Sequence, residues 1–342
     1  MKKRKYFQKP HLRRCGKNLQ ILKILITGAA GFIGSNLCEF FLKKGYKVFG
    51  LDNFSTGHRK NLNEFAKNKN FNFVRGDIRD IKTCQNTTKN IDFVLHQAAL
   101  GSVPRSLNDP ISTNEVNITG FLNLLEASKQ NNVKRFIYAA SSSTYGDSIE
   151  LPKVEERIGK PMSPYAVTKY VNELYASVYN RSFGIETIGL RYFNVFGKRQ
   201  DPNGPYAAVI PKFISQVLNR ENPTINGDGS YSRDFTYINN VLKMNYLALT
   251  TDNVKSFGKV FNTAVGNRIS ILEMTNEIIE GIQKRIPNLG EVKINFGPIR
   301  NGDVAHSHAD ISKAKFFLGY EPSFSFKDGL SDSLDWYIKN LR

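Results

Sequence analysis

Tyr165 and Lys169 are the two side chains whose types and spacing best suit the transfer of a proton. They stand four residues apart behind Ser163 and Pro164, which suit a helix cap and a first helical position, so both should lie on one face of a helix. A lysine at that spacing lowers the pKa of the phenol towards the range in which a base works near neutrality. A tyrosine four residues before a lysine is common by chance, so this assignment depends on the surrounding sequence.

A run of hydroxyl side chains, Ser141, Ser142 and Ser143, follows a predicted strand that ends at residue 140. One of these hydroxyls could hold the oxygen of an alcohol while Tyr165 removes its proton. We assign this role to Ser142, with Ser143 as the second choice. The sequence lacks the signatures of P-loop kinases, HExxH peptidases and GxSxG hydrolases, so these reaction classes are not expected.

A glycine-rich turn near the start of the chain must bring a cofactor to this group. An apolar run at 21–26 predicts a buried strand, Gly28, Gly31 and Gly34 follow it, and a helix is predicted from 32 to about 43. Such glycines permit a tight turn, a close approach of the backbone to a pyrophosphate, and close packing of helix on strand. The free amides and the dipole at the helix start would then hold the phosphates of a dinucleotide.

Asp52 strengthens the dinucleotide prediction. It ends the next apolar run, 48–52, at the spacing expected for a carboxylate that binds an adenosine ribose. A carboxylate in this place repels a 2′-phosphate, which favours NAD over NADP. The alternative is an aspartate that closes a turn, and we prefer the cofactor interpretation because the glycines and the carboxylate are in register.

Length and composition indicate a globular protein of one large domain or two joined domains in 342 residues. Three scattered cysteines without a CxxC pair predict neither disulfides nor a metal site, and they suit a reducing cytoplasm. No apolar run in the sequence reaches the length of a membrane span. The formal charge of +18 includes eight Lys and Arg within residues 1–20, where no acid occurs. We interpret this segment as a solvated extension that can dock as a short helix, in preference to an arm that binds nucleic acid.

Strand and helix patterns alternate through the first half of the chain. This alternation predicts an α/β fold of the Rossmann type, a doubly wound and mostly parallel sheet with a smaller C-terminal substrate-binding lobe. We divide the chain into the basic extension 1–20, an NAD-binding domain 21–190, and a region 191–342 that is mainly the substrate-binding lobe and is partly threaded back onto the sheet.

The chain resembles the extended short-chain dehydrogenase/reductase family, and within it the bacterial UDP-N-acetylglucosamine 4-epimerases. The resemblance covers nearly all of residues 21–342. The segments that carry it are Gly28-Ala-Ala-Gly-Phe-Ile-Gly34, Leu51-Asp-Asn-Phe-Ser-Thr-Gly57, Ser141-Ser-Ser-Thr-Tyr-Gly146, Tyr165-Ala-Val-Thr-Lys169, Leu190-Arg-Tyr-Phe-Asn-Val-Phe-Gly197, Asn226-Gly-Asp-Gly229, Arg233-Asp-Phe235 and Arg300-Asn-Gly-Asp303.

The resemblance implies NAD that stays tightly bound and is regenerated in each cycle. It places the cofactor against the glycine turn, the loop after Asp52, two later strand ends and the Tyr-Lys pair. The cofactor-binding residues that it implies are Gly28, Gly31, Phe32, Ile33, Gly34, Asp52, Asn53, Ser55, Thr56, Gly57, Asp77, Ile78, Gln97, Ala98, Ala99, Tyr165, Lys169 and Val195.

The resemblance also implies a reaction on a UDP-sugar. Tyr165 takes the proton of the 4-hydroxyl as hydride leaves carbon 4, the 4-keto sugar turns over, and hydride returns to its other face. Arg233 and Arg300 would clamp the diphosphate with their guanidinium groups. The substrate-binding residues implied are Ser102, Arg105, Ser141, Ser142, Ser143, Tyr165, Asn194, Val209, Asn226, Arg233, Arg300, Asp303 and Ser307.

Ser307 bears on the choice of sugar. In related epimerases the residue four places after the Asp of the Gly-Asp pair gates the 2-substituent of the sugar. A serine leaves volume for an N-acetyl group, which favours UDP-GlcNAc and UDP-GalNAc over UDP-glucose and UDP-galactose. The uronic acid pair remains an alternative because the site is basic and Arg105 could meet a carboxylate.

Three activities other than epimerisation could be carried by the same fold, and the residues favour none of them. A nucleotide-sugar 4,6-dehydratase needs an acid and a base just after the strand-end hydroxyl, where this chain has Ser143 and Thr144. A simple sugar dehydrogenase would reduce NAD in net terms, and a non-catalytic NAD-binding regulator would commonly lack the Tyr or the Lys. The resemblance further implies a homodimer paired through helices at 110–129 and 164–181. From the apolar pattern and the charge distribution we expect neither a membrane nor a nucleic acid as partner.

Overall fold

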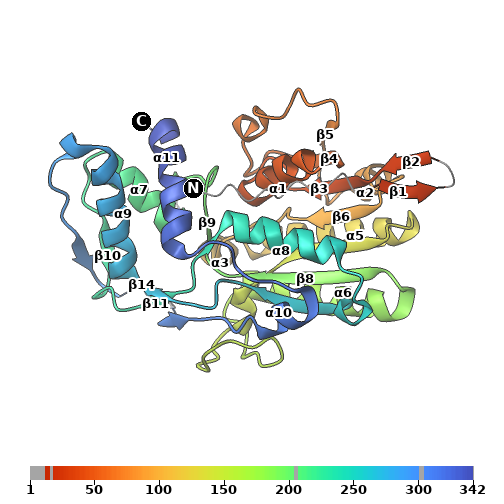
Figure 1. Ribbon diagram of the computed structural model, residues 1–342. Helices are drawn as coiled ribbons and strands as arrows, with labels where there is room; N and C mark the ends of the chain where they lie inside the picture. Colours follow the sequence, from red (N-terminus) through yellow and green to blue (C-terminus); the bar gives the residue numbers. More distant parts are fainter. Residues whose placement is uncertain (1–11, 16–17, 204–206, 300–303, 342) are drawn as a thin grey trace.

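A seven-stranded sheet forms the centre of the protein, and each neighbouring pair of its strands is parallel (Figure 1). The computed structural model describes residues 12–15, 18–203, 207–299 and 304–341, with side chains from residue 21 onward. In spatial order the strands are β13 (Lys259–Thr263), β8 (Glu186–Tyr192), β7 (Arg135–Ser141), β6 (Phe93–His96), β3 (Lys23–Thr27), β4 (Lys47–Asp52) and β5 (Phe71–Arg75). The order reverses at β3, which confirms the predicted doubly wound fold and puts a ligand crevice between β3 and β6.

Two layers of helices cover the sheet because side chains alternate along each strand. In β3, Leu25 packs into one core with Phe121, whereas Ile24 and Ile26 pack into the other. The first core is covered by α2 (Ile81–Thr87), α5 (Gly120–Gln130) and α6 (Pro164–Phe183), and the second by α1 (Phe32–Lys43) and α8 (Ile238–Thr250). Ahead of α5 lie α3 (Val103–Asn108), α4 (Pro110–Asn114) and a π-helical turn, η2 (Glu115–Thr119).

The second half of the chain adds small sheets of short strands and further helices, of which α10 (Ser312–Leu318) packs against β13 at the edge of the large sheet. Helices α7, α9 and α11 pack together at one end of the molecule (Figure 1). The elements are β9 (Val195–Phe196) with β12 (Thr236–Tyr237), β11 (Ser232–Arg233) between β14 (Ile269–Ser270) and β16 (His306–Ser307), β10 (Thr224–Asn226) with β15 (Asn295–Gly297), α7 (Val209–Leu218), α9 (Ile271–Arg285), α10 (Ser312–Leu318) and α11 (Phe326–Leu341). Short 3₁₀ turns are η1 (Arg59–Leu62), η3 (Ser142–Tyr145), η4 (Val254–Ser256) and η5 (Pro287–Leu289).

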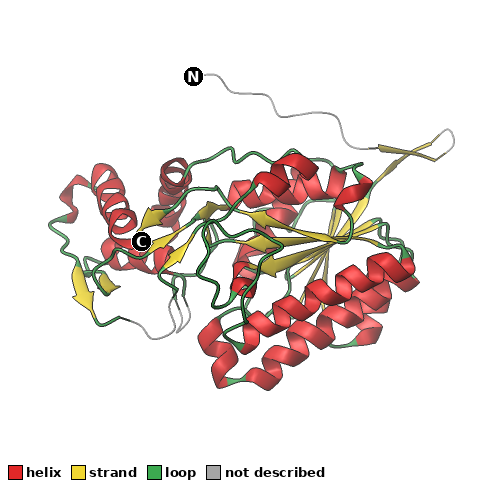
Figure 2. Cartoon of the chain, turned by 90° about the horizontal axis from the view of Figure 1, so that it is seen from below, coloured by secondary structure: helices red, strands yellow, loops and turns green. Residues whose placement is uncertain are grey.

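The described residues of the basic extension pair as the two strands of a hairpin, in place of the short helix by which a solvated extension could dock. Strands β1 (Leu12–Cys15) and β2 (Asn18–Ile21) pair antiparallel, with Leu12 opposite Ile21, and the hairpin extends away from the body of the protein (Figure 2). The backbone hydrogen bonds between the two strands satisfy N–H and C=O groups that would otherwise be paired within a helix. Across the described ranges, every helix falls short of the length and apolar character required to cross a bilayer.

Candidate active site

The turn between β3 and α1 lines a cavity of about 310 Å³. Gly28 has a φ of +66°, and a Cβ there would lie 2.8 Å from the backbone nitrogen of Ala98. A Cβ on Gly34 would lie 2.0 Å from the carbonyl oxygen of Gly28, so close packing of helix on turn requires glycine. Within the described residues, no side chain caps α1 and no acid occupies its first turn. The amides at its start are therefore available to an anion in this cavity.

Asp52 closes β4 beside the same cavity and is 8% exposed. Its two carboxylate oxygens accept hydrogen bonds from the amides of Ala30, at 2.9 Å, and Phe54, at 2.7 Å. Asn53 donates to Asp77 at 2.8 Å, and a side-chain hydrogen bond from Arg79 lowers the pKa of Asp77 to about 2. Two carboxylates at neighbouring strand ends thus face one cavity, as a ribose and an adenine amino group would require.

Gln97 places an unused donor at the edge of the dinucleotide cavity. Asn245 donates to the hydroxyl of Tyr192 at 2.9 Å, and that hydroxyl donates to Oε1 of Gln97 at 3.1 Å. This fixes the orientation of the amide, and its buried Nε2 finds no acceptor among the described residues. An uncapped helix start, a ribose-type carboxylate and an unpaired amide donor together fit a bound dinucleotide.

The cavity contains most of the cofactor residues expected from the sequence, and Gly57, Tyr165, Lys169 and Val195 stand outside its lining. The expected residues that line it are Gly28, Gly31, Phe32, Ile33, Gly34, Asp52, Asn53, Ser55, Thr56, Asp77, Ile78, Gln97, Ala98 and Ala99. Those that sequence reasoning missed are Leu51, Gly76, Leu100, Gly101 and Val116. Four of these five adjoin predicted residues along the chain, whereas Val116 comes from the π-helical turn and had no local signal.

Tyr165 and Lys169 share the first turns of α6, which Ser163 caps through a 3.2 Å bond from the amide of Ala166. Lys169 Nζ lies 5.9 Å from the centroid of the Tyr165 ring and donates to the carbonyl oxygen of Ala139 at 2.8 Å. Ser141 is the serine whose side chain interacts with the Tyr165 hydroxyl and lowers its pKa. The helix and the end of β7 therefore bring a phenol, an ammonium group and a hydroxyl together.

Burial controls the pKa values of this group. It raises the pKa of Tyr165, and the hydrogen bond with Ser141 opposes that rise. Burial also lowers the pKa of Lys169 to about 8, while the charge of Glu173 opposes that fall. We expected Lys169 to lower the pKa of the phenol, but in the structure desolvation of Tyr165 is the larger influence.

The three serines, of which we chose Ser142 for the alcohol-binding role, differ in their surroundings. Ser141 is the last residue of β7 and the one in contact with Tyr165, whereas Ser142 begins the 3₁₀ turn η3. Ser143 donates to Ser141 through its amide, at 3.1 Å, and through its hydroxyl, at 2.9 Å. All three line a cavity of about 410 Å³. The strand runs one residue further than expected, and this shift puts Ser141 opposite the phenol.

A larger cavity of about 840 Å³ lies beside the serine-lined cavity, and Asn194 and Arg233 line both. Arg233 Nη1 donates to the carbonyl oxygens of Ser232 and Ala305, each at 3.0 Å, and Asn194 Nδ2 donates to that of Asp234 at 3.1 Å. These bonds fix both side chains at the junction of the two cavities.

The expected substrate residues divide between the two cavities. Ser102, Asn194, Val209, Asn226 and Arg233 line the larger one, and Ser307 lines the smaller one with the serines. Tyr165 and Arg105 line neither cavity, and Arg105 donates to the carbonyl oxygen of Gly101 at 3.1 Å. Arg300 and Asp303 lie outside the described residues.

Sequence reasoning missed Lys212, Phe213 and Tyr231 in the larger cavity. Lys212 follows Val209 by three residues on α7, so helical spacing from a predicted residue could have found it. Tyr231 lies between the predicted motifs at 226–229 and 233–235, so its closeness to them in the sequence was the one indication of its place.

Comparison with known proteins agrees with this site. The pattern of the NAD dependent epimerase/dehydratase family matches residues 24–264, more than half of the chain. The chain belongs to this family. Membership confirms the resemblance seen in the sequence and the prediction that NAD is the cofactor.

Relatives of this epimerase/dehydratase differ in the sugar that their names state. A relative from Methanocaldococcus jannaschii, named putative UDP-glucose 4-epimerase, is 37% identical over 93% of this chain and 99% of its own. The UDP-N-acetylglucosamine 4-epimerase of Methanobrevibacter ruminantium, solved with UDP-N-acetylmuramic acid, has a TM-score of 0.87 at 37% identity and covers 94% of this chain and 99% of its own. The UDP-glucuronic acid 4-epimerase of Bacillus cereus, solved with UDP-glucuronic acid and NAD, has a TM-score of 0.82 at 36% identity, with coverage of 94% and 100%. Together they support an NAD-dependent UDP-sugar 4-epimerase activity.

A buried ion pair that sequence reasoning missed supports the catalytic helix of this family member. Arg191 on β8 is 2% exposed and donates to both carboxylate oxygens of Glu173, at 2.8 and 2.7 Å. Glu173 is one helical turn beyond Lys169 on α6, and the second arm of Arg191 donates to the carbonyl oxygen of Glu155 at 3.1 Å. The pair joins α6 to the sheet directly behind the site.

Proposed function

We propose that this protein is a UDP-N-acetylhexosamine 4-epimerase, which interconverts UDP-GlcNAc and UDP-GalNAc. The observation that carries the proposal is the contact between Tyr165 and Ser141 at a cavity shared with Arg233 and Ser307. The base thereby lies beside an alcohol-binding hydroxyl that borders the space in which a sugar ring would sit, next to a larger cavity for the UDP moiety.

The residues of the chain would perform the proton chemistry. The phenolate of Tyr165 accepts the proton from the 4-hydroxyl, which Ser141 holds by a hydrogen bond, and returns it at the end of the cycle. Lys169, while protonated, would favour the phenolate electrostatically, whereas burial favours the neutral phenol. The contact places Ser141 in the role that we first gave to Ser142, so we propose Ser141 as the catalytic hydroxyl.

The cofactor would be held by the amides at the start of α1, the carboxylate of Asp52 and the free Nε2 of Gln97. NAD, when bound there, would supply a hydride acceptor and donor for carbon 4, so the overall reaction would be redox-neutral. The proposed rotation of the sugar between these steps requires space, and the adjoining cavities of about 410 and 840 Å³ supply it. We further propose that NAD remains bound between turnovers.

The shape of the smaller cavity favours an N-acetylated sugar. Ser307, the proposed gate for the 2-substituent, lines that cavity with a small side chain, which leaves open the volume that a leucine or an aromatic residue would fill. His306 beside it is held by a 2.9 Å contact between its Nδ1 and the hydroxyl of Ser232. A small gate next to an anchored neighbour leaves volume for the acetamido group.

A uronic acid 4-epimerase is the second candidate, and one observation favours it. Lys153 lines the same cavity, is 5% exposed, and donates one of its three protons to the carbonyl oxygen of Ser148. A buried cation beside the sugar could pair with a carboxylate at carbon 6.

Dehydration is disfavoured by the side chains that follow the catalytic hydroxyl. With Ser141 in that role, the next two positions are Ser142 and Ser143, and neither is an acid or base of the strength that elimination of water needs. Of the described residues that line this cavity, none is Asp or Glu.

We also propose a homodimer in which a second copy covers the outer surface of α4 and α6. That surface exposes apolar side chains that a monomer would leave in water: Ile111, Val167, Leu174, Val178 and Phe183. A groove between the two helices, lined by Pro110, Ile111, Pro164 and Val167, would accept side chains of the partner.

An NMR assay of the purified protein without added cofactor tests the proposed function. Interconversion of UDP-GlcNAc and UDP-GalNAc should exceed that of UDP-glucose and of UDP-GlcNAc uronic acid. Ser307→Tyr should reduce turnover of the N-acetylated sugar at least tenfold more than that of UDP-glucose, because a fully buried group of this size changes binding by about 1–3 kcal/mol. Faster turnover of UDP-glucose by the unaltered protein would refute the specificity.

Replacement of the base provides the matching test of mechanism. Tyr165→Phe should abolish turnover and keep the melting temperature, because only a hydroxyl is lost. Tyr170→Phe on the same helix is the control, since the five-residue step between the two tyrosines turns Tyr170 about 140° around α6 from Tyr165. Normal turnover by Tyr165→Phe would contradict the assignment.

A further inference from the structure

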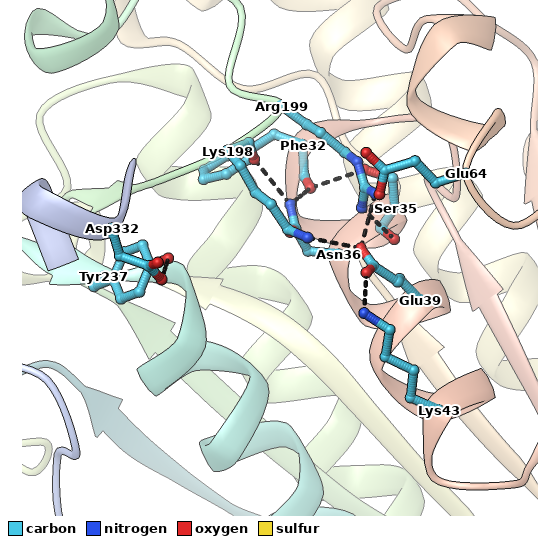
Figure 3. Close-up of polar contacts among 10 residues, drawn as sticks. All are labelled: Phe32, Ser35, Asn36, Glu39, Lys43, Glu64, Lys198, Arg199, Tyr237 and Asp332. Carbon is cyan, nitrogen blue, oxygen red and sulfur yellow. Dashed lines mark hydrogen bonds and ion pairs between the residues drawn. The ribbon is translucent and has the colours of Figure 1, made fainter. Parts of the chain in front are cut away.

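A cluster of charged side chains lies outside the three cavities, where the chain that leaves β9 crosses α1 (Figure 3). Arg199 is at its centre with a side chain 3% exposed. Its Nη2 donates to Glu39, at 2.8 Å, and to Glu64, and its Nη1 donates to the carbonyl oxygen of Ser35 at 3.2 Å. Lys198 donates to the same oxygen of Glu39 at 2.8 Å. One guanidinium group therefore joins α1 to the loop after η1 and to its own segment.

A second set of bonds holds the backbone of this segment to the first turns of α1. Asn36 Nδ2 donates to the carbonyl oxygens of Phe32, at 2.8 Å, and Lys198, at 3.0 Å (Figure 3). Phe32 is the first residue of α1, whose amides face the dinucleotide cavity. The contact thus reaches the part of the helix that would hold the phosphates.

The backbone of Arg199 has a conformation that its side-chain contacts must maintain. Its φ of +69° lies in the left-handed region, which residues with a Cβ rarely adopt. Such a conformation persists where surrounding contacts over-determine it, often at functional sites. Burial would raise the pKa of Glu39, but hydrogen bonds from Lys198 and Lys43 and the charge of Arg199 bring it to about 2, so Glu39 stays charged at neutral pH.

The same segment continues into the walls of both binding sites. Pro202, three residues after Arg199, lines the cavity of 840 Å³. Asp201 lies 2.8 Å from Nε2 of His58, which directly follows the loop that contributes Asn53, Ser55 and Thr56 to the dinucleotide cavity. Residues 198–202 are therefore bonded to the cofactor side at two points and form part of the substrate side.

We propose that Arg199 is a positioning residue that couples the two sites, so that the binding of the UDP moiety and the retention of NAD strengthen each other. A dinucleotide on α1 fixes the helix, the helix fixes Arg199, and Arg199 fixes the wall at Pro202. Because binding free energies are linked, UDP must tighten the binding of NAD by the same factor by which NAD tightens that of UDP. We expect the tighter binding to show as slower release of NAD. The inference rests on the proposed function in taking the 840 Å³ cavity as the UDP site.

The release of NAD from the purified, NAD-loaded protein, with and without saturating UDP, tests the coupling. UDP should slow release by about fivefold or more in the unaltered protein, a usual size for coupling between sites. Arg199→Met should bring the ratio of the two rates close to one. Glu39→Gln should also bring this ratio closer to one, and it replaces Arg199→Met as the test if that variant does not fold.

Arg135→Met is the matched control. Arg135 is also buried, at 2% exposure, and bonds to Glu186 and the carbonyl oxygen of Ala248, but it begins β7 at the end of the sheet opposite the cavities. It should lower the melting temperature without changing the ratio. The coupling is refuted if Arg199→Met and Glu39→Gln keep the original ratio, or if Arg135→Met abolishes it equally. A protein that binds UDP and NAD without any coupling refutes this inference alone, whereas failure to bind UDP refutes the proposed function.

Discussion

Glu173→Gln should weaken the protein and shift the pH dependence of its activity at the same time. The carboxylate of Glu173 is fully paired with Arg191, and its charge raises the pKa of Lys169, which burial holds at about 8. Glutamine keeps the shape and one acceptor but removes the charge. The substitution leaves Arg191 buried without a counter-ion and leaves Lys169 without the carboxylate that supports its protonated form.

The loss of stability can be estimated from the burial of the pair. Removing one partner of a buried ion pair costs about 3–5 kcal/mol. An unfolding entropy of about 2.1 cal/mol/K per residue gives about 0.7 kcal/mol/K for the 342 residues of this chain. The melting temperature should therefore fall by about 4–7 °C, which differential scanning calorimetry can measure.

The effect on activity has a definite sign. Lys169 supports the phenolate of Tyr165 only while it is protonated, so kcat should fall as the pH rises through the pKa of Lys169, about 8. Loss of the Glu173 charge lowers that pKa, and the alkaline limb of the kcat profile should move to lower pH. The profile should be recorded at a temperature well below both melting points.

Glu186→Gln separates the two effects. Glu186 pairs with the buried Arg135 at 2.8 Å but is 24% exposed and lies at the start of β8, away from Lys169. It should lower the melting temperature by less and leave the alkaline limb in place. If Glu173→Gln destabilises the protein and its alkaline limb coincides with that of the unaltered chain, the electrostatic link to Lys169 is wrong.

Three further substitutions test the site and its surroundings. Gln97→Leu should speed the loss of NAD during gel filtration, measured by absorbance of the released nucleotide, because an oriented donor is removed; unchanged retention would contradict its role. Ser141→Ala should reduce kcat about 10²-fold or more in the NMR assay, whereas Ser142→Ala should stay within a few-fold; equal losses would return Ser142 to the catalytic position. Leu174→Lys should yield monomers in size-exclusion chromatography with light scattering, because it places charges on an apolar contact, and an unchanged dimer would move the interface elsewhere.

Local patterns were sufficient to predict the cofactor half of the site. The glycine turn and Asp52 lie at strand ends, and in a parallel sheet these ends meet at one edge, so the order of segments along the chain determines their place in space. Tyr165 and Lys169 were predictable for a similar reason, since a fixed helical spacing brings them onto one face and Ser163 marks where the helix begins.

Other features of the site could not be predicted, because they depend on where a strand ends or on contacts between residues far apart in the sequence. Ser141 rather than Ser142 faces Tyr165 because β7 extends one residue further than its apolar run indicates. The partners Glu173 and Arg191 belong to adjoining elements, but neither has a motif that identifies the other. Arg199 contacts residues more than 130 positions away, and no periodicity predicts such a contact.

The path of β8 has a consequence for how this protein could be recombined. The strand crosses the domain boundary that we expected between residues 190 and 191. Its neighbour β13, which lies about seventy residues later in the chain, completes the sheet beside it. A transplanted fragment that stopped at residue 190 would cut β8 short and expose the edge that β13 covers, a template for aggregation. It would also lack Arg199, so α1 would lose its outside support. The nucleotide-binding half is thus not a portable module, and exchange of substrate specificity between relatives should succeed through loops and single side chains rather than through whole halves.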